Sequence, residues 1–330
     1  MSRGYLSFAL RRLAQAVVVI LVAYVFTFVV ISILPGDPVT NVLRNPQNGF
    51  SEDDIARIVG YYGLDQPIHV QLWRSLSKFL VSDLGVSLRS NRPVADLIGE
   101  VLGSTLLLAT AGLAVALLLA VAIAYGSQVL PKRYGQDLLR TLPSFFLSVP
   151  NFVIGLVLIH VFAFQLRLFR VIDAESPWAT LFAAIALGVP VSAQIAEVLI
   201  AGLDHESRQE YAEVARSRGL GQARLFARHL LKPASLPVVT VIALTVGELL
   251  GGSLITETIF GRTGVGSLIQ RSVTTQDTPV LQAVVSLAAL VFVTVNLVAD
   301  LVYPLLDPRV RVVDGRTAPR PTVQEAGAAG

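Results

Sequence analysis

Long stretches without a charged side chain recur along the chain and are its most regular feature. The uncharged runs cover residues 13–36, 101–131, 141–166, 176–196 and 278–299. A helix needs about 20 apolar residues to cross the hydrocarbon core of a bilayer, and each run reaches that length. The pattern therefore predicts membrane-spanning helices. It excludes a soluble enzyme, a disordered protein and an outer-membrane barrel, whose strands are short and alternate in polarity.

Six spans account for this pattern, and an even number places both termini on the same side of the membrane. We expect them at about residues 13–34, 105–127, 141–166, 178–203, 237–256 and 280–304, with ends good to roughly 2–4 residues. The first uncharged run is longer than the roughly 7–15 residues of a signal peptide, so we interpret it as a retained helix. Pro143, Pro150 and Pro190 predict kinks in their spans.

Composition supports this prediction and removes several kinds of chemistry. Of the 330 residues, 53% are hydrophobic and 15% are charged, against roughly 25% charged in soluble domains. The chain has no Cys, which excludes disulfides, Cys-ligated zinc and a Cys nucleophile. Its 4 His residues lack the spacing of a metal motif. The net charge of +3 fits basic flanks of membrane spans and does not indicate a nucleic-acid partner.

The basic residues indicate which side of the membrane each loop faces. If both termini are cytoplasmic, the inner segments hold sixteen of the 26 Lys and Arg residues. Six of the other ten lie in the long loop over residues 35–104. Lys and Arg concentrate in short cytoplasmic loops, whereas long loops cross largely regardless of charge. We therefore expect an N-in, C-in topology in the cytoplasmic (inner or plasma) membrane.

The segments outside the spans divide the chain into three parts. Residues 1–96 hold the first span and most of the 35–104 loop. Residues 97–304 hold the other spans and a cytoplasmic loop at 204–236. Residues 305–330 form a tail rich in Ala, Gly, Pro and Thr, which is expected to be disordered.

The 35–104 loop is predicted to be partly helical and to lie outside the cytoplasm. Ser51, followed by three acidic residues, is typical of a helix start. The stretch 71–84 carries apolar residues at helical spacing. Two interpretations are open: an amphipathic cap lying on the membrane surface, and a docking surface for a soluble partner.

The cytoplasmic loop at 204–236 holds the strongest functional pattern. Ser207 and Glu210 have the S-x-x-E spacing of a capping box, which predicts a helix start. Gly219 would end that helix, and a second short helix is expected at about 222–231. Two amphipathic helices about a glycine turn would form a knob that fits a groove on another protein. Two helices lying on lipid headgroups are the alternative.

This loop resembles the EAA loop of ABC importer permeases, in the string Glu213-Val-Ala-x-x-x-Gly219. Other segments match in order along nearly the whole chain: Pro35-Gly36-Asp37-Pro38, Tyr62-Gly63-Leu64-Asp65-Gln66-Pro67, Asp83-Leu84-Gly85-x-Ser87, Glu257-Thr258-Ile259-Phe260, Asn296-Leu297-x-x-Asp300 and Leu306-Asp307-Pro308-Arg309. Together they make the chain similar to the B-type permease of the dipeptide/oligopeptide/nickel branch.

The resemblance implies an all-α membrane protein with the type I ABC importer permease fold (MetI-like). It implies import of di- or oligopeptides by a complex with a sister C-type permease, two ABC ATPase subunits and an extracytoplasmic substrate-binding protein. The chain would be no enzyme and hold no cofactor, with ATP and Mg on the ATPases, and it has no G-x-x-x-x-G-K-[ST] phosphate loop. The loop residues expected to couple to an ATPase are Glu210, Tyr211, Glu213, Ala215, Arg216, Arg218, Gly219, Leu220, Phe226, Arg228 and His229.

Polar residues within the spans are candidates for the substrate path, because a polar group facing lipid is costly. The candidates are Asn151, Gln194, Glu197 and Glu248. Asp300 belongs to the family pattern, so we expect it to have a structural partner such as a helix cap or a salt bridge. An ion-coupled secondary transporter using Glu197, Glu248 and Asp300 is an alternative, although the internal repeats typical of such transporters are missing. An intramembrane enzyme is a further alternative, but the spans offer no convincing nucleophile–base or metal constellation.

Three departures from the family pattern leave the substrate open. Val214 stands where Ala is usual, Glu248 stands where a neutral or aromatic residue is usual, and residues 170–177 match poorly. The last two bear on the substrate path. Nickel chelates, glutathione-like peptides and sugars therefore stay open beside di- and oligopeptides.

Overall fold

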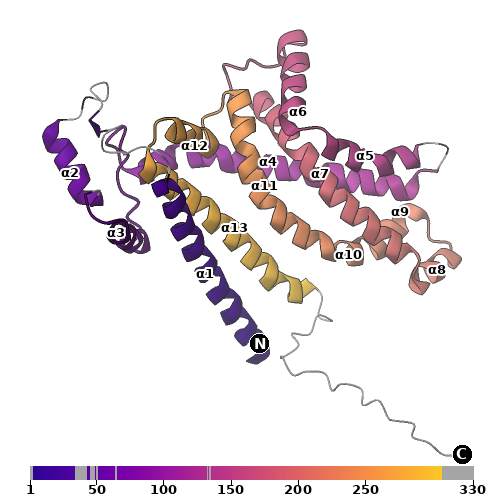
Figure 1. Ribbon diagram of the computed structural model, residues 1–330. Coiled ribbons are helices and arrows are strands. Elements are labelled where there is room, and N and C mark those ends of the chain that lie inside the picture. Colours follow the sequence, from indigo (N-terminus) through magenta and orange to yellow (C-terminus); the bar gives the residue numbers. More distant parts are fainter. Residues whose placement is uncertain are drawn as a thin grey trace, which may run out of the picture.

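A computed structural model describes residues 3–33, 43–44, 49, 51–63, 65–131, 133 and 135–306 (Figure 1). Within this part the chain is helical, and the one β feature is an isolated bridge between Val86 and Pro93. The all-α prediction is confirmed for these residues. The motif at residues 35–38 and the tail from residue 307 lie outside the described residues.

Four helices are long and apolar enough to cross a membrane by themselves. They are α1 (Arg3–Ile33), α4 (Val94–Val129), α7 (Pro177–Ser207) and α13 (Thr278–Leu306). α1 contains the first predicted span up to Ile33, and the other three contain the second, fourth and sixth predicted spans. Because α13 continues to Leu306, the first two residues of the tail predicted as disordered are helical.

The third and fifth predicted spans belong to helix pairs that are sharply bent. α5 (Gln136–Ser148) meets α6 (Asn151–Leu158) and the π-helical segment η4 (Ile159–Gln165) at 99°. The helical stretch Gln222–Ala234 meets α11 (Leu236–Phe260) at 61°. The described residues therefore hold four candidate spans, or up to six if each bent pair crosses the membrane as one.

Pro150 explains the break in the third predicted span. A proline has no N–H to donate, and it disfavours helical geometry in the residue before it. Val149 accordingly adopts an extended conformation with φ −98° and ψ 118°, and Pro150 has ψ 138° just before α6 begins. The kink predicted at Pro150 is thus a bend of 99° between α5 and the helical stretch that begins with α6. In contrast, α5 and α7 continue past Pro143 and Pro190.

Shorter helices fill the connections. They are α2 (Glu52–Tyr62), α3 (Ile68–Leu80), α8 (Glu210–Ser217), α9 (Gln222–Leu225), the π-helical η5 (Phe226–Leu230), α10 (Leu231–Ala234) and α12 (Val265–Thr274). α2 begins at the predicted cap, because the Ser51 side chain accepts a hydrogen bond from the Asp54 N–H.

The core of the molecule lies where α4 and α7 pack against each other (Figure 1). Alanines with almost no exposed surface meet there, among them Ala116, Ala120 and Ala124 of α4 and Ala183 and Ala184 of α7. Small side chains let two helix backbones approach closely, which replaces the hydrophobic effect as the source of helix packing in lipid. α1 packs mainly on α13, and only 17% of its apolar window is buried, so α1 lies at the edge of the bundle.

Asp277, between α12 and α13, ties the segment before α4 to the rest of the molecule. Its carboxylate accepts hydrogen bonds from the Ser87 hydroxyl at 2.5 Å and from the Leu88 N–H at 3.0 Å. Only 4% of Asp277 is exposed, and this burial raises the pKa of its carboxyl group.

Candidate functional site

The predicted cytoplasmic loop folds as two short helical stretches, as expected, but it begins differently. The prediction of a capping box at Ser207 and Glu210 is wrong, because α7 continues through Ser207 and Gln209 is the residue that precedes α8. The Ser207 hydroxyl instead donates to the Asp204 carbonyl at 3.0 Å. The hydroxyl of a serine in the last turn of a helix can bond to a backbone carbonyl of that same helix, and it is then not available to cap the next helix.

Gly219 ends α8, and its backbone conformation explains why a glycine stands there. Its φ is +80°, in the left-handed region that side chains with a Cβ disfavour. The Gly219 N–H donates to the Arg216 carbonyl at 2.9 Å, and the Leu220 N–H donates to the Ala215 carbonyl at 3.2 Å. These bonds close the helix C-terminus. The predicted glycine turn is confirmed.

The loop residues separate into an inner and an outer set. Ala215 and Phe226 are buried, and Leu220 and His229 are half-buried. The Phe226 ring meets Tyr125 of α4 edge-on, with ring centroids 5.1 Å apart. The other predicted coupling residues are exposed: Glu210, Tyr211, Glu213, Arg216, Arg218, Gly219 and Arg228. Ala215 and Phe226 therefore support the loop from within, and the exposed set is the part that a partner could contact.

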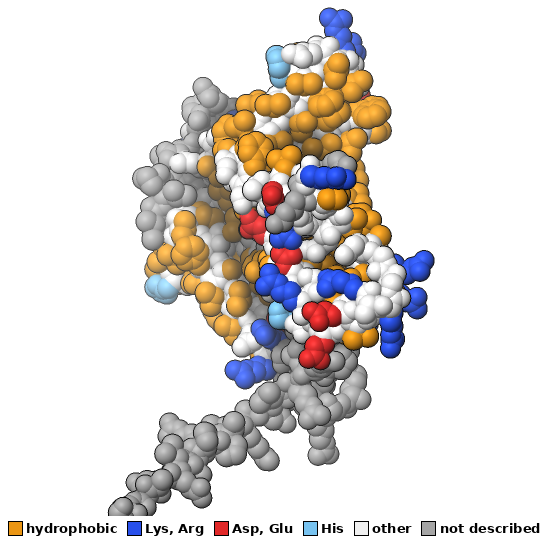
Figure 2. Space-filling view, turned by 90° about the vertical axis from the view of Figure 1, so that its right-hand side faces the viewer, with side chains coloured by type: hydrophobic (Ala, Val, Ile, Leu, Met, Phe, Trp, Pro, Cys, Tyr) orange, Lys and Arg blue, Asp and Glu red, His pale blue; other side chains and the backbone are white. Residues whose placement is uncertain are grey.

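The exposed set, which we call the knob face, mixes both signs of charge. Figure 2 views the molecule from the side of α8 and α9 and shows acidic and basic side chains gathered there below a hydrophobic region. Glu210 and Glu213 lie in the first turn of α8, where an acid also favours the helix dipole. The Tyr211 hydroxyl donates to Glu206 at 2.5 Å. Partial burial and this carboxylate raise the pKa of Tyr211 to about 12, so it stays neutral.

Three helices meet at the base of the loop through Asp204, which sequence reasoning missed. Arg140 of α5 donates two hydrogen bonds to the Asp204 carboxylate, at 2.7 and 2.8 Å. Gln128 of α4 donates a third, at 2.8 Å. The Arg140–Asp204–Gln128 node thus joins α4, α5 and α7 directly before the knob face. The sequence shows only that Asp204 is an acid at the end of the fourth apolar span and that Arg140 is a basic residue just before the third. It does not show that the two meet.

Three of the four candidate path residues, Gln194, Glu197 and Glu248, form with Ser144 a polar strip across α5, α7 and α11. Gln194 donates to Glu248 at 2.8 Å, and the Ser144 hydroxyl donates to Glu197 at 3.3 Å. Gln194 and Glu197 are three residues apart, so they share one face of α7. Glu197 and Glu248 are exposed in the isolated chain. Asn151, at the start of α6, is half-buried, and no hydrogen bond within the described part of the chain joins it to the other three candidates.

Asp300 and Glu257 have partners within the chain. Asp300 of α13 forms an ion pair with Arg12 of α1 at 3.0 Å, which confirms the predicted structural partner. Glu257 of α11 is fully buried and accepts hydrogen bonds from the Thr105 hydroxyl at 2.7 Å and the Ser267 N–H at 3.2 Å. A Cβ on Gly264 would lie 2.2 Å from the Glu257 carboxyl carbon. The chain's own carboxylate therefore occupies the N-terminus of α12.

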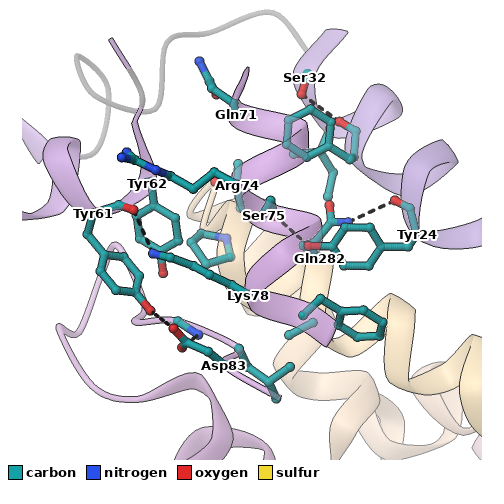
Figure 3. A pocket seen from close by; sticks show the side chains of 18 of the residues that line it. Tyr24, Ser32, Tyr61, Tyr62, Gln71, Arg74, Ser75, Lys78, Asp83 and Gln282 are labelled. Carbon is teal, nitrogen blue, oxygen red and sulfur yellow. Dashed lines mark hydrogen bonds between the residues drawn. The ribbon is translucent and has the colours of Figure 1, made fainter. Parts of the chain in front are cut away.

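A pocket of about 270 Å³ lies where α2 and α3 meet α1 and the start of α13 (Figure 3). The Lys78 ammonium donates to the Tyr61 carbonyl at 2.8 Å and lies over the Tyr61 ring. The Tyr61 hydroxyl donates to Asp83 at 2.5 Å. Partial burial lowers the pKa of Lys78. Because these polar groups bond to one another, the pocket walls brace the junction of the four helices.

Long apolar helices, a polar strip across α5, α7 and α11 and an exposed helical loop are the features of a multi-pass membrane protein that contacts a soluble partner. Residues 94–312 match the family "Binding-protein-dependent transport system inner membrane component", and residues 5–109 match the family of its N-terminal part. The chain belongs to this family of ABC importer permeases, as the resemblance of its motifs indicated.

Several proteins similar to this chain carry the name "Glutathione transport system permease protein GsiC". The protein from Salmonella paratyphi A (strain ATCC 9150 / SARB42) is 33% identical over 306 residues, which cover 93% of this chain and 99% of the relative. The protein from Escherichia coli (strain K12) is 31% identical over the same length and shares. The similarity therefore spans nearly the whole of each protein.

Proposed function

We propose that this chain forms one half of the translocation path of an ATP-driven importer of peptide-type substrates. A sister permease would supply the other half, and an extracytoplasmic binding protein would deliver the substrate. Two ABC ATPases, which would hold ATP and Mg, would bind on the cytoplasmic side, one of them at the knob face. Both termini would be cytoplasmic, with each bent helix pair crossing the inner membrane as one of six spans. Family membership and the names of the relatives support this proposal.

The observation that carries the coupling role is the two-layered construction of the loop. Buried Ala215 and Phe226 belong to the main hydrophobic core, where Phe226 meets Tyr125 of α4, while the charged residues of α8 are exposed. A loop that only connected two spans would need a few residues and no internal core. A rigid knob with exposed charges of both signs fits a groove on a soluble partner better than it fits anionic lipid headgroups.

The Arg140–Asp204–Gln128 node would pass the motion of the knob face into the membrane. Asp204 and Gln194 lie on the same unbroken helix, ten residues or about 15 Å apart. A tilt of α7 driven at the knob face would therefore move Gln194 against Glu248 of α11. In this mechanism ATP-driven closure of the ATPases changes the width of the polar strip between α7 and α11.

Peptide-type substrates fit the polar strip. Glu248 is an exposed acid, and its hydrogen bond from Gln194 leaves acceptor capacity for a substrate ammonium group. The relatives' name supports glutathione-like peptides among the open substrates. For an ion-coupled transporter, by contrast, one of the three acids it would use is already paired with Arg12.

Reconstitution of the complete complex tests the proposal. Uptake of a dipeptide or glutathione should require ATP and the binding protein, and should persist when the proton gradient is dissipated. A charge reversal on the knob face, Arg218→Glu, should reduce co-purification of the ATPases, whereas Arg89→Glu, on the exposed segment before α4, should leave it unchanged. Uptake driven by a proton gradient without ATP would refute the importer function.

The orientation is tested separately by labelling. Because the chain has no Cys, Ala223→Cys and Asn91→Cys each introduce a single reactive site at an exposed position. A membrane-impermeant maleimide should label Ala223→Cys from the cytoplasm only and Asn91→Cys from outside only. The reverse pattern would refute the N-in, C-in topology.

A further inference from the structure

α3 leaves one of its faces apolar and without a partner in the described part of the chain. Trp73 and Leu80 are 71% and 67% exposed, and Val81, directly after the helix, is 75% exposed. Trp73 and Leu80 are seven residues apart, so they project from the same side of α3. In a segment outside the spans, such a face is expected to be covered by something.

The opposite face of α3 is attached to α1 at a definite depth. The rings of Tyr24 in α1 and Phe79 in α3 are 4.5 Å apart, and the hydroxyl groups of Tyr24 and Ser75 are 2.6 Å apart. The apolar span of α1 covers Ala9–Ser32. Tyr24 lies eight residues before its end, or about 12 Å along the axis. α3 is therefore attached beside the last turns of a membrane-spanning helix and does not stand above them.

The surroundings of α3 are those of a lipid boundary. α1 lies at the edge of the bundle, and Val22 and Phe26, which project from the side of α1 away from Tyr24, are 61% and 67% exposed. In Figure 1, α3 is seen nearly end-on while α1 lies along the picture, so α3 crosses α1 instead of running beside it. Lys78 turns away from the apolar face, toward Tyr61 and the pocket (Figure 3). An apolar face containing a Trp, with basic groups on the flank, is typical of a helix in the membrane interface.

We propose that α3 lies in the interfacial region of the bilayer, with Trp73, Leu80 and Val81 inserted among the lipids at the end of α1. This inference rests on the chain spanning a membrane. It is independent of the substrate, of the ATPases and of which side the termini occupy. Of the two interpretations of the 35–104 loop, it favours the amphipathic cap on the membrane surface over the docking surface for a soluble partner.

Site-directed spin labelling tests this position directly. The complete complex, with accessible Cys removed from the partner subunits, is prepared with Trp73→Cys, Leu80→Cys or Val81→Cys in this chain, labelled with a nitroxide and placed in nanodiscs of phosphatidylethanolamine and phosphatidylglycerol. Collisions with oxygen, which concentrates in lipid, are compared with collisions with a water-soluble nickel chelate. We expect the oxygen rate to exceed the nickel rate several-fold at each of the three positions.

Ser90→Cys is the matched control, because Ser90 is exposed on the same extramembrane segment and differs from Cys by one atom. The nickel rate should exceed the oxygen rate there. A nickel-dominated signal at positions 73 and 80 would show that the face is in water, and low collision rates with both reagents would show that protein covers it. Either result overturns the inference, as would loss of oxygen access when the binding protein is added. Transport measured on the same preparations tells a failure of this inference apart from a failure of the importer function.

Discussion

The Arg140–Asp204–Gln128 node should stabilise the base of the loop by an amount that can be worked out from its exposure. The side chains of Arg140 and Asp204 are 34% and 28% exposed. Exposed ion pairs contribute about 0.2–1 kcal/mol, and breaking a buried pair costs about 3–5 kcal/mol. A half-buried pair with two parallel hydrogen bonds should lie between these limits. We expect a coupling energy of about 1–2 kcal/mol.

A double-mutant cycle isolates this energy from other effects of each substitution. Arg140→Gln, Asp204→Asn and the double variant are purified in the complete complex, and their thermal unfolding is measured in detergent. A loss of 1 kcal/mol lowers Tm by roughly 2–4 °C in chains of 150–250 residues. Each single variant should therefore lose a few degrees, and the double variant should lose little more than either one. Arg224→Gln, an exposed Arg→Gln change in the same loop, should leave Tm unchanged.

The same variants test whether the node transmits motion. If Asp204 links the knob face to α4 and α5, its loss should raise the number of ATP molecules hydrolysed per substrate imported while the ATPases stay bound. Strict additivity of the two single variants, within about 0.3–0.5 kcal/mol, would refute the stabilising pair. Unchanged ATP use per substrate would refute the mechanical role.

Three further predictions follow from single residues. Gly219→Ala forces a side chain into φ +80° at a cost of about 1–2 kcal/mol and should weaken co-purification of the ATPases, whereas Gly221→Ala, at φ −66° and in equally open space, should not. Glu248→Gln keeps a hydrogen bond to Gln194 but removes the charge, so uptake of free-amine peptides should fall relative to N-acetylated ones, and equal effects on both would contradict substrate recognition. Burial raises the pKa of Asp277 above its ordinary 3.8, so its contribution to stability is present below pH 3.8 and is lost as the pH rises through the raised pKa. Asp277→Asn should therefore flatten the dependence of Tm on pH above that value, and an unchanged slope would argue against this cause.

Features that depend on one short segment could be predicted from the sequence. The apolar runs gave the long helices, because about 20 residues without charge are enough to favour lipid over water. Ser51 marked the start of α2 and Gly219 marked the end of α8, since a cap or a left-handed turn is decided by the residue itself and its nearest neighbours. The ordered motifs likewise indicated the family that the whole-chain comparison established.

Features that depend on distant segments were decided only by tertiary structure. The capping box at Ser207 failed because α7 continues through that residue, past Asp204 and its partners on α4 and α5. The partners of Asp204 are 64 and 76 residues away along the chain, and the carboxylate at the start of α12 reaches the Thr105 hydroxyl from 152 residues away. A polar side chain buried among helices bonds to whichever group the packing brings within about 3 Å. The spacing of residues along the chain does not indicate these partners. The Arg140–Asp204–Gln128 node and the position of Glu257 at the N-terminus of α12 are therefore known only from the tertiary structure.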